Sequence, residues 1–285
     1  MKTFLVIAIA SLLSTTTFAL KLPVLRESIG PQSVKLPATF TADYDFEGIV
    51  ALNNCSGSLI QLDGMNDDSQ ALVLTNGHCV EGGFTEPGKV NYKIPSSRRF
   101  TLLNKAAGNA GQVFAVELVY STMTNTDMAI YKVRETYGQI KSRFGINPFR
   151  LETAHPLMNE NIQVISGYWK RGYQCGVENF IFQLKEDRWL WTDSLRYSRP
   201  GCETIGGTSG SPIVRAGTKV VIGVNNTGNE DGLKCAMNNP CEIDERGNVS
   251  FTLGYSYGQQ THWLYSCVTS TNDIDLSKEG CTLPK

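Results

Sequence analysis

Three residues that lie far apart in the sequence have the types needed for acyl transfer. They are His78, Asp127 and Ser209, in that order along the chain. A serine hydroxyl is a poor nucleophile until a base takes its proton, and the base needs an acid that fixes its tautomer. Ser209 could therefore be the nucleophile, His78 the base and Asp127 the residue that orients His78.

The residues around Ser209 favour it over Ser211 as the nucleophile. Gly207 and Gly210 precede and follow Ser209, and they allow a sharp turn with close approach of a substrate. Ser211, in contrast, abuts Pro212. The backbone N–H groups of Gly207 and Ser209 could then stabilise an oxyanion that develops during the reaction.

The other histidines and several other aspartates have structural interpretations. His155 precedes a proline in a loop-like stretch, and His262 lies in a predicted terminal helix. Asp193 and the pair at 67–68 suit surface positions, where aspartate is common in turns.

The N-terminus has the pattern of a secretory signal. Lys2 supplies a positive charge, residues 4–13 are almost entirely apolar, and Ala19 ends a cleavage-site pattern. A run of about ten apolar residues is too short for a bilayer, which needs about 20. We therefore predict a signal segment over 1–19 and an exported protein, secreted or periplasmic, with no membrane partner.

Eight cysteines follow this segment, and export makes disulfides available to all of them. No Cys-x-x-Cys pair occurs, and the closest two are Cys235 and Cys241. This spacing argues against a zinc site. We expect neither a metal nor an organic cofactor.

The composition is that of a globular protein. Of the 285 residues, 41% are hydrophobic and 19% are charged, which excludes a disordered chain. The formal net charge of −1 gives no electrostatic reason to expect nucleic acid as a partner. Residues 20–46 are polar and contain prolines, which predicts a propeptide or an N-terminal arm. Residues 47–285 are expected to form the folded domain.

Short apolar runs separated by turn residues predict a β-rich structure. Residues 113–120 alternate in hydrophobicity, as a half-buried strand does. A helical pattern occurs over 259–269, with apolar residues on one face. Many short strands and one terminal helix indicate an all-β barrel or sandwich.

The motifs resemble those of the chymotrypsin/trypsin-fold serine proteases. The similar segments are residues 55–60, 75–79, 127–130 and 207–212. The resemblance implies two six-stranded antiparallel β-barrels with a C-terminal helix and an active site between the barrels. It also assigns the oxyanion hole to Gly207 and Ser209. An α/β-hydrolase is disfavoured, because its serine comes first in the chain.

One departure from the family pattern concerns activation. In trypsin-like zymogens the residue before the nucleophile is an aspartate, which receives the new N-terminal ammonium group after cleavage. Thr208 stands at that position here and cannot form the ion pair. We predict that a zymogen of this chain is activated without that switch. The motif Gly-Thr-Ser-Gly-Ser-Pro is closer to the bacterial glutamyl-endopeptidase-like branch.

The resemblance also implies a set of substrate-binding residues: Glu203, Thr204, Asn225, Asn226, Thr227 and Gly228. Glu203 would lie at the base of the specificity pocket and attract a lysine or arginine side chain, or it is a surface residue beside Cys202. Asn225 replaces the histidine of the glutamate-selective branch, which counts against a glutamate preference. Residues 226–228 would pair with the substrate backbone as an added strand.

Three disulfide assignments follow from the resemblance or from position. The resemblance pairs Cys55 with Cys79. Cys202 is expected to pair with Cys235 or Cys241, which leaves Cys175 the remaining partner. The last pair would be Cys267 with Cys281, which would tie down the tail.

The sequence as a whole predicts a secreted serine endopeptidase that works through a Ser-His-Asp triad and an acyl-enzyme. Its expected partners are polypeptide substrates and protein inhibitors, and we expect a monomer. The alternative is a catalytically silent homologue that acts as a binding protein. The intact set of His78, Asp127 and Ser209 argues against this alternative.

Overall fold

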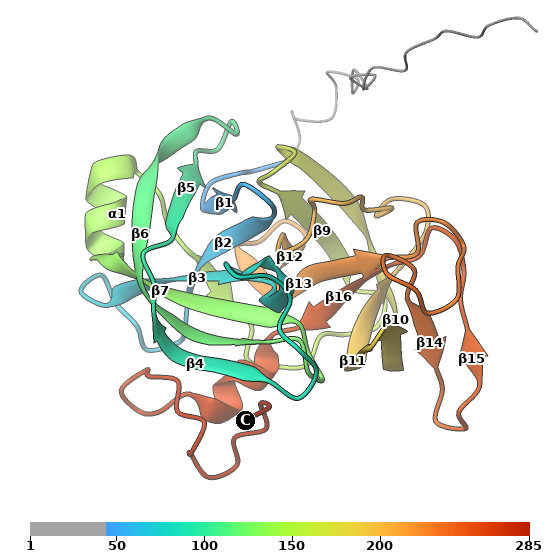
Figure 1. Ribbon diagram of the computed structural model, residues 1–285. Coiled ribbons are helices and arrows are strands. Elements are labelled where there is room, and N and C mark those ends of the chain that lie inside the picture. The colour runs from blue at the N-terminus through green and yellow to red at the C-terminus, as the bar shows by residue number, and fades with distance from the viewer. Residues whose placement is uncertain (1–43) are drawn as a thin grey trace, which may run out of the picture. The chain divides into compact units, whose positions relative to one another are not determined.

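The computed structural model describes residues 44–285. The predicted signal segment, 1–19, and residues 20–43 of the predicted arm lie outside the described residues. The described part of the chain is built mostly of β-strands (Figure 1). Within it, no helix is long and apolar enough to cross a membrane.

Six antiparallel strands form the first barrel: β1 (Ile49–Ala51), β2 (Ser56–Gln61), β3 (Gln70–Thr75), β5 (Arg99–Leu103), β6 (Asn109–Thr122) and β7 (Met128–Thr136). They pair in the order β1-β5-β6-β7-β3-β2, and the barrel closes where β1 pairs with β2. Ser58 of β2, for example, lies opposite Ile49 on one side and Leu74 on the other. A further strand, β4 (Val90–Pro95), pairs with β6.

Six more antiparallel strands form the second barrel: β9 (Asn161–Ser166), β10 (Arg171–Glu186), β11 (Trp189–Tyr197), β12 (Pro212–Arg215), β13 (Val220–Gly228) and β16 (Ser256–Gln260). This barrel closes where β13 pairs with β16. The short strand β8 (Phe149–Leu151) runs parallel to both β2 and β13 and joins the two barrels. A hairpin of β14 (Cys241–Ile243) and β15 (Val249–Ser250) extends from β10. The predicted fold of two six-stranded barrels is confirmed.

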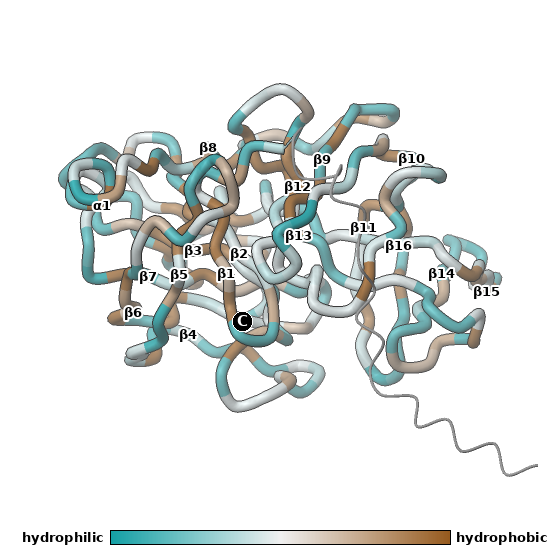
Figure 2. Tube along the Cα trace, turned by 90° about the horizontal axis from the view of Figure 1, so that it is seen from above, coloured by the Kyte–Doolittle hydropathy of each residue, from teal (hydrophilic) through white to brown (hydrophobic). Residues whose placement is uncertain are grey.

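Alternation along the strands divides the core into layers, because successive side chains point to opposite faces of a sheet. Leu59 packs with residues of the first barrel, whereas Ile60, next in β2, packs in a cluster that contains residues of both barrels. Ile213 and Val214 of β12 divide in the same way between the second barrel and the shared cluster. Figure 2 shows the hydrophobic stretch along β12 in the interior of the trace.

The predicted strand at 113–120 is present within β6, and its buried face can now be assigned. Val113 and Ala115 are buried, while Phe114 and Val116 are on the other face. Val116 is exposed, and the Phe114 ring lies under the guanidinium of Arg134.

An α-helix that the sequence analysis did not predict follows β7. It is α1 (Tyr137–Phe144), which begins with a capping box: the Thr136 side chain accepts from the backbone N–H of Gln139, whose side chain accepts from the backbone of Thr136. Gly145 ends it with a φ of 68°, a left-handed conformation that suits glycine. Eight residues between strands give too short a pattern to separate a helix from a strand.

The predicted terminal helix at 259–269 is wrong in extent and type. Gln259 and Gln260 belong to β16 and pair with β13. The helical part is a 3-10 helix, η2 (His262–Cys267). Leu264 and Cys267 are its buried residues, so the apolar face of the pattern was correct.

The four disulfides confirm two predicted pairs and correct a third. Cys55–Cys79 and Cys267–Cys281 are present. The prediction that Cys202 pairs with Cys235 or Cys241 is wrong, because Cys202 bonds to Cys175 of β10, with Cα atoms 5.6 Å apart. Cys235 and Cys241 close a short loop with each other.

Candidate functional site

His78 lies in the 3-10 helix η1 (Gly77–Cys79), directly after β3. Its Nδ1 is 2.6 Å from Oδ2 of Asp127, and its backbone N–H donates to Oδ1 of the same carboxylate at 3.0 Å. Asp127 is fully buried and immediately precedes β7. Only glycine fits at position 77, because a Cβ there would lie 1.9 Å from the carbonyl oxygen of Thr122. The glycine lets this segment approach Asp127, and both oxygens of the carboxylate bond to His78.

The second barrel fixes the loop that carries Asp127. The backbone N–H of Asn125 donates to Leu190, and the Asn125 carbonyl accepts from the N–H of Thr192 in β11. The Trp191 indole N–H also donates to the Met123 carbonyl at 3.0 Å. The position of Asp127 thus depends on contacts from both barrels.

The electrostatic surroundings favour the protonated form of His78. Burial lowers the pKa of the imidazole, but the carboxylate of Asp127 and, in addition, that of Glu186 raise it. The resulting pKa lies above the usual 6.5. A histidine in this state gains a proton readily and holds its Nδ1–H toward Asp127.

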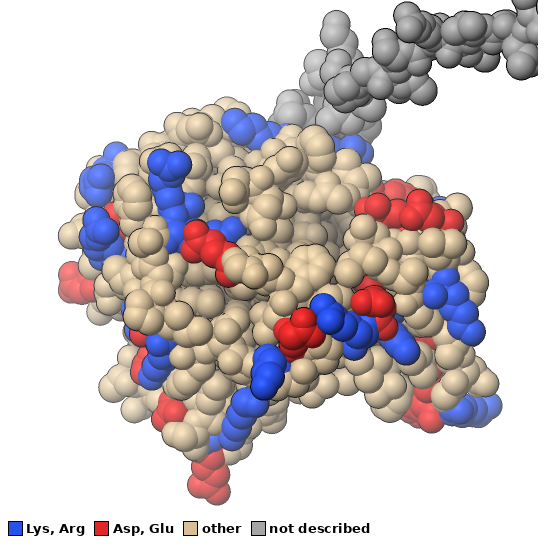
Figure 3. All heavy atoms as spheres, in the orientation of Figure 1, with Lys and Arg blue, Asp and Glu red and all other residues tan. Residues whose placement is uncertain are grey.

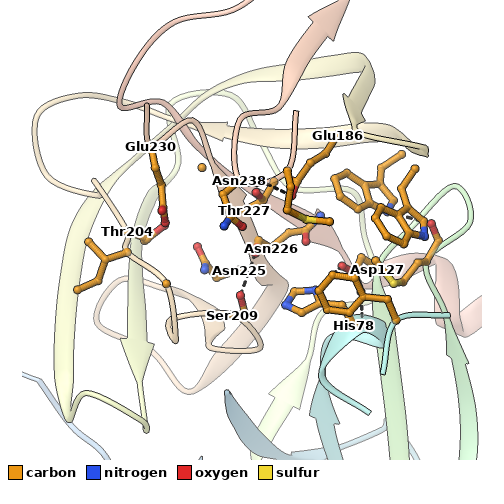
Figure 4. A pocket seen from close by; sticks show the side chains of 18 residues that line it. His78, Asp127, Glu186, Thr204, Ser209, Asn225, Asn226, Thr227, Glu230 and Asn238 are labelled. Atoms are coloured by element: carbon orange, nitrogen blue, oxygen red, sulfur yellow. Dashed lines mark hydrogen bonds and ion pairs between the residues drawn. The ribbon is translucent and has the colours of Figure 1, made fainter. Parts of the chain in front are cut away.

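Ser209 lies in a tight turn just before β12. Gly207 and Gly210 on either side have φ values of 86° and 78°, and a Cβ at Gly210 would lie 2.1 Å from the Ser56 carbonyl oxygen. The Ser209 hydroxyl donates to the carbonyl of Asn226 at 3.2 Å. In Figure 4 the side chains of Ser209 and His78 point toward one another across the pocket.

Asn76 connects the segments that carry these three residues. Its side-chain N–H donates to the Asp127 carbonyl at 2.8 Å, and its side-chain oxygen accepts from the N–H of Gly210. The residue is fully buried and directly precedes Gly77 and His78 in the chain. The sequence analysis did not assign it a role. The available signal was an asparagine two positions before the histidine, and the sequence does not show that it is buried.

The peptide between Gly206 and Gly207 is held in one orientation. The Trp169 indole N–H donates to the Gly206 carbonyl at 2.8 Å. In a trans peptide the following N–H points the opposite way, so the N–H of Gly207 is directed away from Trp169. Neither this N–H nor that of Ser209 donates to another described residue. Two free donors therefore lie within one turn.

The buried Ser56 hydroxyl supports the same turn. It accepts from the N–H of Tyr168 and contacts the Ser166 hydroxyl, both at 3.1 Å. The backbone N–H of Ser56 donates to the Ser209 carbonyl at 2.8 Å. Thr208 is buried, and its hydroxyl has no hydrogen-bond partner.

A pocket brings together most of the residues that the sequence analysis assigned to substrate binding. It is lined by His78, Asp127 and Ser209 and by the predicted Thr204, Asn225, Asn226, Thr227 and Gly228. The Asn225 side-chain oxygen accepts from the Tyr197 hydroxyl. The Asn226 side chain is buried with neither its nitrogen nor its oxygen hydrogen-bonded.

Glu203 is not part of this pocket, so the structure does not place it at the pocket base. Its carboxylate accepts from the N–H of Gly201 and lies 3.6 Å from the guanidinium of Arg199. It is an exposed residue, in keeping with the surface interpretation. The carboxylates in the pocket besides Asp127 belong to Glu186 and Glu230, which the sequence analysis did not identify.

One group of metal-ligating residue types lies beside the site. It consists of Cys55, His78 and Cys79. The two sulfur atoms are joined in a disulfide and so present no thiolate.

Comparison with known proteins finds one family model and several solved structures that are similar to this chain. A family model described as a trypsin-like peptidase domain matches residues 55–224. The protein is similar to the MamO protease domain from Magnetospirillum magneticum, with 14% identity over 80% of this chain and 99% of that chain and a TM-score of 0.48. It is also similar to a Glu endopeptidase, with 17% identity, 75% and 85% coverage and a TM-score of 0.41. A search of curated proteins finds no match.

A histidine titration by NMR tests the electrostatics of the site. We expect His78 to titrate above 6.5 and His262, whose pKa burial lowers, to titrate near 4. In the Asp127→Asn variant the His78 value should fall below 6.5, because burial remains while the neighbouring charge is lost. A His78 value at or below 6.5 in the unaltered protein would contradict this account.

The variant Asn76→Ala tests the bridge between the segments. It removes the side-chain donor of the buried Asp127 carbonyl and one of the two acceptors of the Gly210 N–H, which also donates to Asn225, so the free energy of unfolding should fall by about 1–3 kcal/mol. The exposed Asn66, whose hydrogen bonds lie within one turn, provides the control Asn66→Ala with a much smaller loss. Equal losses in urea denaturation would show that Asn76 has no special role.

Proposed function

The chain belongs to the family of trypsin-like peptidase domains, and we propose that it is an exported serine endopeptidase. The observation that carries this proposal is the pair of His78 Nδ1 and Asp127 Oδ2, 2.6 Å apart, in a pocket that Ser209 also lines. Four disulfides among eight cysteines support export to an oxidising compartment.

The proposed reaction has two stages. His78 donates its Nδ1–H to Asp127, which leaves Nε2 free to take the proton of Ser209 as Oγ attacks the scissile carbonyl. The N–H groups of Gly207 and Ser209 stabilise the oxyanion. His78 then gives the proton to the departing amine, and an acyl-enzyme remains. Water attacks this ester with His78 again as base, which releases the carboxylic acid and restores Ser209.

The Ser209 hydroxyl must change its partner for this reaction. In the free protein it donates to the Asn226 carbonyl. Rotation about its Cα–Cβ bond would direct it to Nε2 of His78. A substrate strand that pairs with residues 226–228 would compete for the same backbone and favour this rotation.

Activation is proposed to occur without an ion pair to a new N-terminus. Thr208 has no charge to offer, and its hydroxyl is buried without a partner. The contacts of Trp169 and Ser56 instead hold the turn that contains Gly207. Cleavage within the predicted segment 20–46 would then not need to supply an ammonium group to this turn, and Phe46 at its end is a buried residue of the core.

The proposed substrates are polypeptides, and the pocket disfavours those with glutamate beside the scissile bond. Its lining includes Glu186 and Glu230 but no lysine or arginine among the described residues. Like charges brought together in a confined site repel.

Over the face in Figure 3 acidic and basic side chains are interspersed, in keeping with the net charge of −1.

A fluorophosphonate probe tests the function directly. The processed protein should become labelled and should cleave a peptide library, and Ser209→Ala should do neither. Ser211→Ala, which alters the neighbouring buried serine, provides the control that keeps labelling. Absence of labelling in folded, processed protein would contradict the proposal and favour the catalytically silent homologue.

Trp169→Phe tests whether the oriented peptide matters for catalysis. This change removes the N–H that holds the Gly206 carbonyl and keeps the ring, so Trp169 is tested as a positioning residue. We expect kcat to fall about tenfold or more with little change in KM, because an oxyanion is bound only in the transition state. Tyr168→Phe, at an exposed neighbour, should leave both nearly as they are. An unchanged kcat in Trp169→Phe would rule out this role.

A further inference from the structure

Glu186 is a buried carboxylate in the pocket that the proposed mechanism does not use. It ends β10, is 5% exposed, and lines the pocket with His78. One oxygen accepts from the N–H of Asn238 at 2.9 Å, and the other has no hydrogen-bond partner. Burial raises the pKa of its carboxyl group and the charge of Asp127 adds to this, although Thr227, Asn238 and the charge of His78 oppose it. An unpaired carboxylate is costly to bury, so this residue needs an explanation.

The surroundings of Glu186 are aromatic and apolar. Phe84 packs edge-on against His78 and Trp189, with ring centroids 5.7 and 5.4 Å apart. Met237, which directly precedes the Asn238 that donates to Glu186, also lines the pocket. Phe84 and Met237 are both more than 40% exposed, so they can shift to admit a side chain. Apolar walls that lead to an acidic end match the long stem and charged head of lysine or arginine.

The charged side chains that line the pocket also indicate a cationic ligand. The two oxygens of Asp127 are occupied by His78, whereas Glu186 keeps one oxygen free. No lysine or arginine of the described residues lines the pocket to neutralise it, and His78, the one histidine in the lining, is already bonded to Asp127. A cation from a ligand would supply the missing partner and form a charge-assisted hydrogen bond.

The geometry of a bound peptide indicates which of its side chains would reach Glu186. A substrate strand along residues 226–228 would direct alternate side chains to opposite sides. In Figure 4 Thr204 and Glu230 lie on one side of this strand, and His78 and Glu186 lie on the other. The residue whose carbonyl Ser209 attacks would point toward Thr204. The residue before it would therefore point toward Glu186.

We propose that Glu186 ends a subsite beside His78 that binds a lysine or arginine side chain of the substrate, on the residue preceding the one whose peptide bond is cleaved. This inference rests on the proposed function. It adds a specificity-determining residue that lies outside the set of residues carrying the reaction. The Phe84 and Met237 side chains would contact the stem of the bound residue, and Glu186 would pair with its charge.

Matched peptides test this subsite. Two substrates differ only at that position, one with lysine and the other with norleucine, which has a similar stem and no charge. In the unaltered protein kcat/KM should be at least about tenfold higher for the lysine peptide. In Glu186→Gln the ratio should approach one. Glu203→Gln changes an exposed glutamate outside the pocket, and it should retain the ratio.

Three outcomes would overturn the subsite: no lysine preference in the unaltered protein, a preference kept in Glu186→Gln, or a preference lost equally in Glu203→Gln. The lysine preference of the unaltered protein is measured without a variant, so it can overturn the proposal even if Glu186→Gln does not fold. Failure of the proposed function is recognised separately by absent fluorophosphonate labelling. In that case the binding of the two peptides to Ser209→Ala, with and without Glu186→Gln, is compared. A loss of lysine preference in the double variant supports the subsite, and no loss overturns it.

Discussion

The side-chain amide of Asn76 is the interaction on which the arrangement of the site depends. His78 and Asp127 come from the first barrel, and Ser209 comes from a turn that leads into the second. Asn76 donates to the backbone carbonyl of Asp127 and accepts from the N–H of Gly210, which follows Ser209. Leaving a buried amide without a hydrogen bond destabilises the folded state. The bonds of Asn76 therefore restrict the movement of both segments. The two barrels are thereby fixed at the point where three side chains must meet.

The turn before Ser209 has a second constraint, which is the space available to it. A Cβ at Gly207 would lie 2.9 Å from Tyr168 and 3.0 Å from Trp169. The Trp169 indole and the Ser56 hydroxyl then determine which way the peptide groups face. Neutral hydrogen bonds thus hold a turn at which Thr208 has no charge to offer. None of these bonds involves a charged N-terminus.

The sequence was sufficient to predict features that depend on local pattern. The two barrels follow from short alternating strands and from the resemblance, and the motifs around His78, Asp127 and Ser209 are contiguous. Features that depend on distant partners were missed or wrong. Glu203 has a family-like position, but its side chain is exposed, beside that of Arg199. Cys202 forms a disulfide with Cys175 because β10, which carries Cys175, passes beside it. Neither the bridging role of Asn76 nor the burial of Glu186 is visible without knowing what packs against them.

Two buried carboxylates act on one imidazole, and their different hydrogen bonding separates their roles. Asp127 has both oxygens bonded to His78, so it is committed to orienting the ring. Glu186 also raises the pKa of His78, yet it keeps an oxygen unpaired. A substrate cation at Glu186 would offset the charge of that carboxylate and reduce its pull on the His78 proton. His78 would then be more often neutral, which is the form that can accept the proton of Ser209. Binding at the subsite would therefore favour the base as well as the substrate position.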